Sequence, residues 1–242
     1  MNPDIQQVIF GMNAEVLFEL GNRYYNGQGV TQDYTKAVEC FTEAANQGHV
    51  GAQHNLGICN QIGHGVTKNY TKAVEWFTKA ATRGNANAQY SLGMCYHNVH
   101  VLANTNAAAG IFEQLAAEGH SDSQFWIGRC HYFGEGISSN ESKAFKWFSQ
   151  SADQDSSYAQ TMVGTCYRWG YGVAVDHAKA FEWYRKSAEQ NNRQGQCCLG
   201  DCYQTGRGAA ADIDTAVFWY RKAAQHGYES AVANLEQLSR WL

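Results

Sequence analysis

The sequence has little proline, no long hydrophobic run and no excess of one charge. Pro3 is the single proline among 242 residues, and 24 residues are glycine, which suggests short uninterrupted helices separated by glycine turns. No stretch approaches the roughly 18 apolar residues that a membrane-spanning helix needs. Lys and Arg number 18 and Asp and Glu 22, a net charge of −4 without clusters of either sign. Because nucleic-acid binding depends on clustered cations, we expect neither a nucleic-acid partner nor a membrane span.

Signals of secretion and of catalysis are also missing. The first Lys or Arg is Arg23, whereas a secretory signal places a positive charge before its apolar stretch. We therefore expect a cytoplasmic protein, with secretion by a non-classical route as the alternative. The sequence has no Gly-x-Ser-x-Gly, no Gly-x-x-x-x-Gly-Lys and no His-Glu-x-x-His motif. We expect no enzyme activity, no cofactor and no metal site.

The sequence is an array of similar units. Five successive steps of 36, 36, 35, 36 and 36 residues connect the glycines Gly21, Gly57, Gly93, Gly128, Gly164 and Gly200. Five units continue with a Gly-x-Gly pair, an aliphatic residue or alanine and, three residues later, Asp or Asn. An aromatic column then follows, which we place at Trp76, Phe112, Trp147, Trp183 and Trp219. A period of this length is typical of helical solenoids.

Each unit is predicted to contain two helices, called helix A and helix B below. In the second unit, helix A is expected from Gly51 to Ile62 and helix B from Asn69 to about Arg83. Gly63 can adopt the left-handed conformation that ends a helix, and the Asn69 side chain can cap the next one. The apolar stripes are Ala52, Leu56, Cys59 and Asn60 on helix A and Ala73, Trp76, Phe77 and Ala80 on helix B. One hairpin cannot bury two such stripes, so the units must stack.

The repeated pattern A-x-x-x-L-G-x-x-Y-x-x-G-x-G-V-x-x-D-x-x-K-A-x-x-W-x-x-K-A-A-x-x-G resembles the Sel-1-like repeat, a relative of the tetratricopeptide repeat. The best copies span residues 52–84 and 159–191, and the resemblance covers about residues 13–240. It implies an all-α superhelix, or solenoid, that serves as an adaptor or scaffold for other proteins.

We predict a single solenoid domain over residues 1–242. It comprises an N-terminal cap (1–12), six repeats (13–48, 49–84, 85–119, 120–155, 156–191 and 192–227) and a C-terminal capping helix (228–242). The apolar residues expected to cover the open ends of the core are Ile5, Val8 and Ile9 at one end and Ala231, Leu235 and Leu238 at the other.

The third unit departs from the pattern. Val99-His100-Val101 replaces the Gly-x-Gly turn, and we place the loss of one residue between Ala117 and Gly119. Two interpretations stay open for the loop Val99–Asn104. The unit is either a decayed repeat, or the loop is a functional kink or partner contact.

Cysteine is abundant, with eight residues, but its spacing does not favour disulfides. Five cysteines occupy one column on the buried side of helix A: Cys59, Cys95, Cys130, Cys166 and Cys202. Neighbouring units lie about 8–10 Å apart, whereas a disulfide needs Cα atoms within about 7 Å. We therefore predict eight free thiols. A cysteine-rich secreted branch of the resembled family pairs helix A with helix B by disulfides, and that pairing is absent here.

The side of helix A opposite its buried stripe is the candidate binding surface. In the resembled family this side lines a concave groove. We predict that the groove binds a partner through Phe18, Tyr25, His54, Ile58, Tyr90, Met94, His97, Phe125, Arg129, Tyr132, Arg168 and Trp169. Aromatic residues and arginine are enriched in binding hot spots. The alternative is that these side chains pack on one another.

Two functions remain. The first is a non-catalytic scaffold that binds another protein or a peptide in the groove, including an effector- or immunity-type protein of bacteria, as a monomer or weak dimer. The second is a β-lactam-binding hydrolase like members of the cysteine-rich branch, which would need paired cysteines and a nucleophile with its base.

Overall fold

The structure is a computed structural model of the chain, and it describes residues 11–98 and 104–239. Within these residues it contains thirteen α-helices and no strand, which confirms the predicted all-α solenoid. The helices are α2 (Ala14–Asn26), α3 (Tyr34–Asn46), α4 (Val50–Ile62), α5 (Tyr70–Ala81), α6 (Ala86–Asn98), α7 (Thr105–Ala117), α8 (Ser121–Phe133), α9 (Glu141–Ala152), α10 (Ser157–Trp169), α11 (His177–Glu189), α12 (Arg193–Thr205), α13 (Ile213–Gln225) and α14 (Glu229–Ser239). Even-numbered helices are A helices and odd-numbered ones are B helices.

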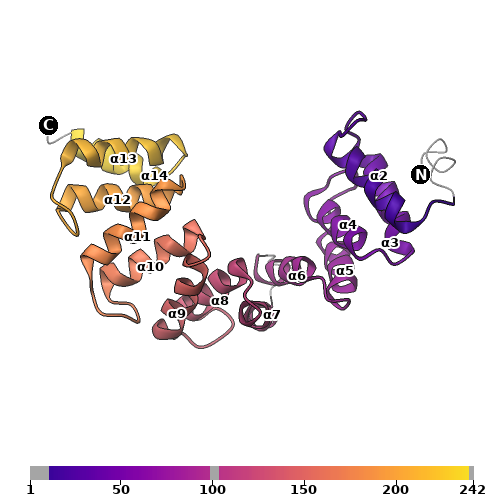
Figure 1. Cartoon of the computed structure of the whole chain (residues 1–242), viewed down its shortest axis with the longest axis horizontal. Helices are drawn as coiled ribbons and strands as arrows, with labels where there is room; N and C mark the ends of the chain where they lie inside the picture. The colour runs from indigo at the N-terminus through magenta and orange to yellow at the C-terminus, as the bar shows by residue number, and fades with distance from the viewer. Residues whose placement is uncertain (1–10, 99–103, 240–242) are drawn as a thin grey trace. The chain divides into compact units, whose positions relative to one another are not determined.

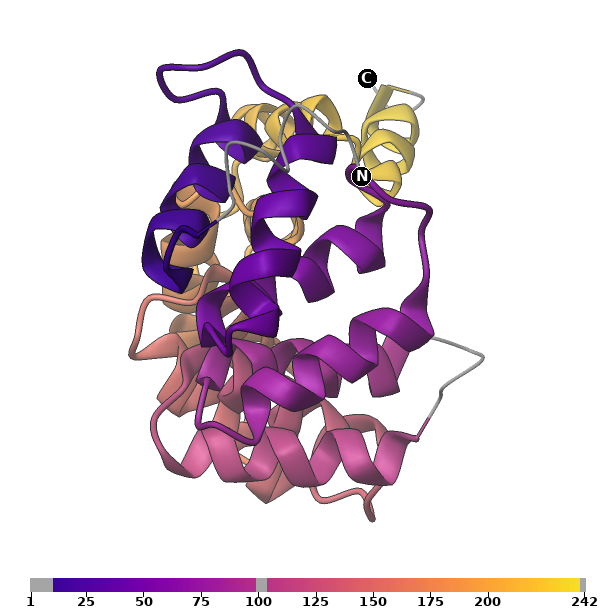
Figure 2. The same cartoon turned by 90° about the vertical axis from the view of Figure 1, so that its right-hand side faces the viewer.

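The helices divide between two compact units. The N-terminal unit comprises Met1–Ile111 and the C-terminal unit Phe112–Leu242. In the N-terminal unit, consecutive helices from α2 to α6 pack against one another, and in the C-terminal unit consecutive helices from α8 to α14 do the same (Figure 1). Figure 2 gives a view onto the N-terminal unit, in which these helix pairs can be followed.

The helix ends are set by the residues that the repeat places there. Gly63, with φ of 88°, ends α4 in the left-handed conformation that favours glycine, and its N–H donates to the Cys59 carbonyl. Asn69 begins α5, and its side chain accepts a hydrogen bond from the Lys72 N–H. Both predicted caps of the second unit are confirmed.

In five helix pairs, the core contains a ring packed on a glycine. The side chain of Phe77 lies against Gly57, so that a Cβ atom on the glycine would be 2.5 Å from a ring carbon. The same relation joins Gly21 to Phe41, Gly128 to Phe148, Gly164 to Tyr184 and Gly200 to Tyr220. Glycine therefore occupies this position because the aromatic side chain fills the space of its missing side chain.

The predicted aromatic column is wrong by one residue at its four tryptophans, and correct at Phe112. Fully buried positions are held by Phe77, Phe112, Phe148, Tyr184 and Tyr220, whereas the preceding tryptophans Trp76, Trp147, Trp183 and Trp219 are only partly buried. The reason is that only one ring can face the helix A glycine. The Trp76 ring packs at the edge of the core between the first two repeats, and its other side is covered by the Lys79 ammonium group 4.0 Å from the ring centre.

The third repeat lacks one residue between α6 and α7, and not between Ala117 and Gly119 as predicted. The N–H of Asn104 donates to the carbonyl of Tyr96, eight residues earlier, whereas Asn69 donates to Asn60, nine residues earlier. The lost residue therefore precedes Asn104, which shifts the register and makes Phe112 the counterpart of Phe77. Residues 99–103 of the predicted contact loop lie outside the described residues.

A glutamine near the start of helix A links five of the helix pairs to the pair before them, and it was not predicted from the sequence. The side-chain NH2 group of Gln53 donates to the carbonyl of Ala45, eight residues earlier and in the preceding B helix, at 3.3 Å. Four later repeats contain the same bond, from Gln89 to Ala81, Gln124 to Ala116, Gln160 to Ala152 and Gln196 to Ala188. Each bond is a second one to a carbonyl at the end of a helix, because the same carbonyl also accepts the backbone N–H three residues later.

The C-terminal helix α14 packs against the last repeat. In α14, Ala231 and Leu238 are buried, and Leu235 packs against the same cluster as Tyr220. The predicted N-terminal cap residues Ile5, Val8 and Ile9 lie outside the described residues.

All eight cysteines are free thiols, as predicted, and seven of them are buried. Burial raises the pKa of the Cys59 and Cys95 thiols to about 11 and that of the Cys166 thiol to about 12. These groups therefore pack as small apolar side chains.

Candidate functional site

The twelve predicted binding residues named above all lie on A helices, and we call this set the A-helix face. Trp169 is exposed and the other eleven are partly buried. Residues on successive A helices contact one another within each unit. His54 Nε2 of α4 lies 3.3 Å from Ser91 Oγ of α6, and Phe125 of α8 contacts the Tyr158 ring of α10. The face therefore combines the two interpretations, because its side chains pack on one another and still reach solvent.

The aromatic residues at the N-terminal end of this face are held by histidines. Phe18 stacks on His49 with ring centres 4.3 Å apart, and the Tyr25 hydroxyl lies 3.2 Å from His64 Nδ1. The Tyr25 ring also meets Tyr34 edge to face, at 5.1 Å. Burial raises the pKa of the Tyr25 hydroxyl, which therefore stays protonated at neutral pH. These contacts fix both rings in place.

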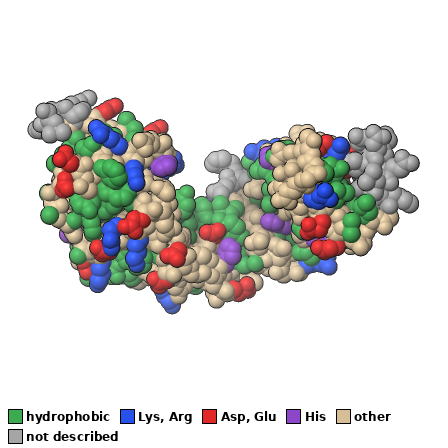
Figure 3. Space-filling view, turned by 45° about the horizontal axis from the view of Figure 1, so that its top comes forward, with side chains coloured by type: hydrophobic (Ala, Val, Ile, Leu, Met, Phe, Trp, Pro, Cys, Tyr) green, Lys and Arg blue, Asp and Glu red, His purple; other side chains and the backbone are tan. Residues whose placement is uncertain are grey.

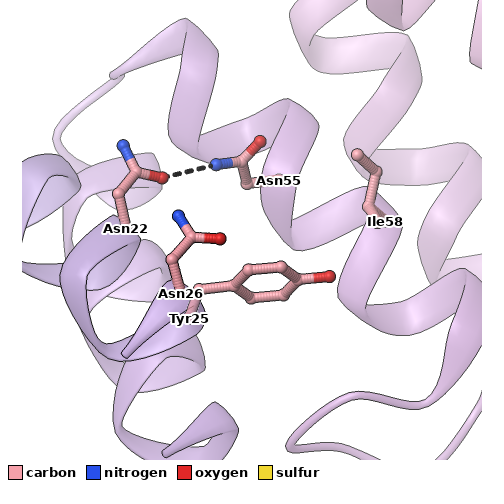
Figure 4. A pocket seen from close by; sticks show the side chains of 5 residues that line it. All are labelled: Asn22, Tyr25, Asn26, Asn55 and Ile58. Atoms are coloured by element: carbon pink, nitrogen blue, oxygen red, sulfur yellow. Dashed lines mark hydrogen bonds between the residues drawn. The ribbon is translucent and has the colours of Figure 1, made fainter. Parts of the chain in front are cut away.

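A pocket of about 210 Å³ opens beside Tyr25 in the N-terminal unit. Its lining comes from Asn22, Tyr25 and Asn26 of α2 and from Asn55 and Ile58 of α4 (Figure 4). Asn55 Nδ2 donates to Asn22 Oδ1 at 3.0 Å, which joins the two helices across the pocket. Tyr25 and Ile58 are among the predicted binding residues, but the contribution of Asn26 and Asn55 was missed.

Arg129 forms the centre of an aromatic cluster in the C-terminal unit. Its guanidinium group lies over the rings of Trp126 and Phe133, at 4.8 and 5.3 Å from their centres. Next to it, Tyr132 meets Phe133 and the Tyr171 ring edge to face, at 4.8 and 5.4 Å. Among the described residues, Arg129 has no carboxylate partner. The structure therefore presents an arginine that is held by rings and has its charge available.

Arg168, the other predicted arginine, is already paired. Its Nη1 donates to Asp201 Oδ2 at 3.0 Å, which links α10 to α12. The second oxygen of Asp201 accepts hydrogen bonds from the Tyr220 hydroxyl at 2.8 Å and from Asn234 Nδ2 at 3.2 Å. Asp201 thus uses both oxygens within the protein, and Arg168 contributes to packing between repeats.

Three large rings of this unit remain open to solvent on or beside the A-helix face. The exposed fractions of Phe133, Tyr158 and Trp169 are 55%, 65% and 54%. Of these three, Trp169 is among the predicted binding residues. Trp126, Tyr158 and Tyr171 were missed, although Trp126 precedes Arg129 by three residues, a spacing that brings side chains together on a helix.

The described part of the chain shows few features of other kinds of site. No group of three His, Cys, Asp or Glu side chains in residues 11–98 and 104–239 comes together to hold a metal ion. None of the described helices has the length and apolar character needed to cross a membrane. Acidic and basic side chains are interspersed on the surface shown in Figure 3.

Comparison with protein families assigns the chain. The Sel1 repeat model matches residues 14–49, 50–85, 86–120, 121–156, 157–192 and 194–228. The chain therefore belongs to the Sel1 repeat family, whose members typically mediate protein–protein interaction. A search of curated proteins returned no match.

Solved structures of the same kind extend this assignment. A protective antigen present in uropathogenic Escherichia coli strains is 31% identical over 97% of this chain, with a TM-score of 0.84, and this chain spans 51% of its length. A Sel1 repeat protein from Oxalobacter formigenes is 28% identical, with 90% of this chain and 86% of that one covered and a TM-score of 0.82. An immunity protein from Pseudomonas aeruginosa is 18% identical over 93% of this chain and 87% of its own, with a TM-score of 0.57, and shares the fold.

Proposed function

We propose that the protein is a non-catalytic scaffold that binds a segment of another protein on the A-helix face of its C-terminal unit. The observation that carries this proposal is Arg129, a cation held between two rings and without a carboxylate partner among the described residues. Its planar guanidinium group can donate two parallel hydrogen bonds to a carboxylate while it stacks on aromatic faces.

The surroundings of Arg129 define the partner's chemistry. Phe133 and Trp169 are exposed apolar side chains. On their helices, Phe133 lies four residues after Arg129, and Trp169 directly follows Arg168. Exposed aromatic side chains together with an arginine match the composition of binding hot spots. The expected partner segment therefore carries Asp, Glu or a free C-terminus beside an apolar anchor residue.

Binding to an array of decapeptides tests this proposal. Peptides with an acidic residue or a free C-terminus next to Leu, Phe or Trp should retain the chain, and Arg129→Ala should weaken their binding by about 1–3 kcal/mol. Lys143→Ala, at an exposed position on α9, is the matched control and should change it by less than about 1 kcal/mol. Equal affinity of the wild type and Arg129→Ala for every retained peptide would contradict the proposal.

The alternative function as a β-lactam-binding hydrolase finds no support in the described residues. All eight cysteines are free, so the pairing that marks the cysteine-rich branch is absent. Turnover of the chromogenic cephalosporin nitrocefin would overturn the non-catalytic proposal.

A further inference from the structure

The two units offer the same positions with different chemistry. Relative to the helix A glycine, the pocket residues Asn22, Tyr25, Asn26, Asn55 and Ile58 correspond to Arg129, Tyr132, Phe133, Met162 and Thr165 in the C-terminal unit. The tyrosine is common to both. Where the C-terminal unit has a cation and an exposed ring, the N-terminal unit has two carboxamides.

The pocket lining contains donors and acceptors but no charge. Each asparagine side chain carries an NH2 donor and a C=O acceptor. The hydrogen bond from Asn55 to Asn22 orients both groups and leaves the NH2 of Asn22 for another acceptor. Asn26 is exposed, and no other described residue forms a hydrogen bond with its carboxamide. A ligand that matches this lining is neutral and supplies a donor and an acceptor side by side.

We propose that this pocket binds the main chain of an extended peptide. A peptide group has one N–H and one C=O. A single carboxamide can therefore accept from the peptide N–H and donate to the peptide C=O. The volume of about 210 Å³ is below the roughly 300–1,000 Å³ of pockets for drug-sized ligands. It suits a peptide group with a small apolar side chain, which would rest on Ile58 and Tyr25. The inference rests on the proposed role in protein binding and assigns a second contact to it.

The environment of Tyr25 argues against a ligand that stacks flat, such as a sugar ring. Its ring already contacts Tyr34, Phe41 and His64, with centres 5.1, 6.3 and 5.8 Å away. Its hydroxyl is engaged with His64. The carboxamides are therefore the groups that bind the ligand. They form hydrogen bonds with the peptide main chain and place little restriction on the peptide's side chains.

The test uses the full chain and an array of pentapeptides made of Gly, Ala, Val, Ser and Thr, acetylated and amidated so that they carry no charge. We expect a subset to be retained. For a retained peptide, methylation of single backbone nitrogens should weaken binding at least tenfold at one or two positions and leave the others unchanged. Asn26→Ala and Asn55→Ala should each weaken it at least about fivefold. Asn46→Ala, at an exposed asparagine of α3, is the control and should bind like the wild type.

The outcomes separate this inference from the function proposed for Arg129. Uncharged and acidic peptides are tested separately, so a failure with acidic peptides alone affects only the function proposed for Arg129. Asn26→Asp keeps the side-chain shape and removes the donor, so it should weaken binding even if an alanine variant unfolds. No retained peptide, a flat response to nitrogen methylation, or wild-type affinity in the Asn26 and Asn55 variants would overturn the inference. If the wild type binds to a glycan array and the Asn26 and Asn55 variants do not, the pocket binds a sugar and the inference is overturned.

Discussion

Gly57 and Phe77 are packed so closely that a methyl group on the glycine would lie 2.5 Å from the phenyl ring. Interiors are packed too densely to absorb such an overlap without displacement of a side chain or of the backbone. The contact recurs in four other repeats with Phe or Tyr as the ring. It fixes how near helix A approaches helix B, and so sets the geometry that positions both candidate binding sites.

Replacement of this glycine by alanine should therefore destabilise the protein. We expect Gly57→Ala to lower the free energy of unfolding by about 1–3 kcal/mol, the usual effect of overpacking. Gly110→Ala is the matched control, because a Cβ atom at this exposed position in α7 would meet nothing within 4 Å. There, alanine should stabilise the protein by about 0.5–1 kcal/mol through its helix propensity. Urea unfolding of the two variants decides, and equal effects would contradict the packing argument.

Adjacent aromatic residues on helix B should differ in their contribution. Phe148 is fully buried against Gly128, so Phe148→Ala should cost about 3–5 kcal/mol. Trp147→Ala should cost only about 1–2 kcal/mol, because part of the indole already contacts water. Thermal and urea unfolding measure both values. A larger loss for Trp147→Ala would restore the tryptophan column as the core of the repeat.

The repeat could be predicted from the sequence because its signals are local. A glycine cap and an Asn or Asp cap each act within a few residues, and Gly63 and Asn69 behave as expected. Their recurrence about every 36 residues makes the repeat visible in the sequence. The choice between Trp76 and Phe77 could not be made this way. Both lie within the apolar stripe of helix B, and only the position of Gly57 on the neighbouring helix decides which ring is enclosed.

The candidate site was only partly predictable for a similar reason. Helical geometry places Arg129 and Arg168 on the same side of their helices, and they look equivalent in the sequence. Asp201, 33 residues after Arg168, removes that equivalence by pairing with it. The carboxamide pocket likewise depends on Asn22 and Asn55 meeting across two repeats. Pairing between repeats depends on their stacking, which a single unit does not encode.

The buried glutamines should contribute to the coupling between repeats. Gln196→Ala removes a buried hydrogen bond to the Ala188 carbonyl, which keeps the bond from the Asn191 N–H. We expect a loss of about 0.5–1.5 kcal/mol in the free energy of unfolding. Gln194→Ala, two residues earlier in α12 and exposed, should change it by less than about 0.5 kcal/mol. Similar urea midpoints for the two variants would show that the bond has no net effect.

The buried thiols should make the folded state less stable at high pH. Burial raises the pKa of Cys59, Cys95 and Cys130 to about 11 and that of Cys166 to about 12, against 9.0 for an ordinary thiol. A raised pKa means that the folded state retains protons that the unfolded chain loses above pH 9. The stabilising effect is complete below pH 9 and is lost as the pH rises towards 11–12, by up to about 1.4 kcal/mol per pH unit for each thiol.

Cys166→Ala isolates the effect of one thiol. Its packing contribution changes stability at every pH, so the informative quantity is the slope of unfolding free energy against pH between pH 9 and 11. That slope should be less steep in the variant by up to about 1.4 kcal/mol per pH unit, since one fewer proton is released on unfolding. Cys198→Ala serves as a second test, because burial also raises the pKa of that thiol and should give a change of the same sign. Urea titrations at pH 8, 9, 10 and 11 supply the slopes, and parallel curves for wild type and both variants would mean that the thiols ionise in the folded state as readily as in the unfolded chain.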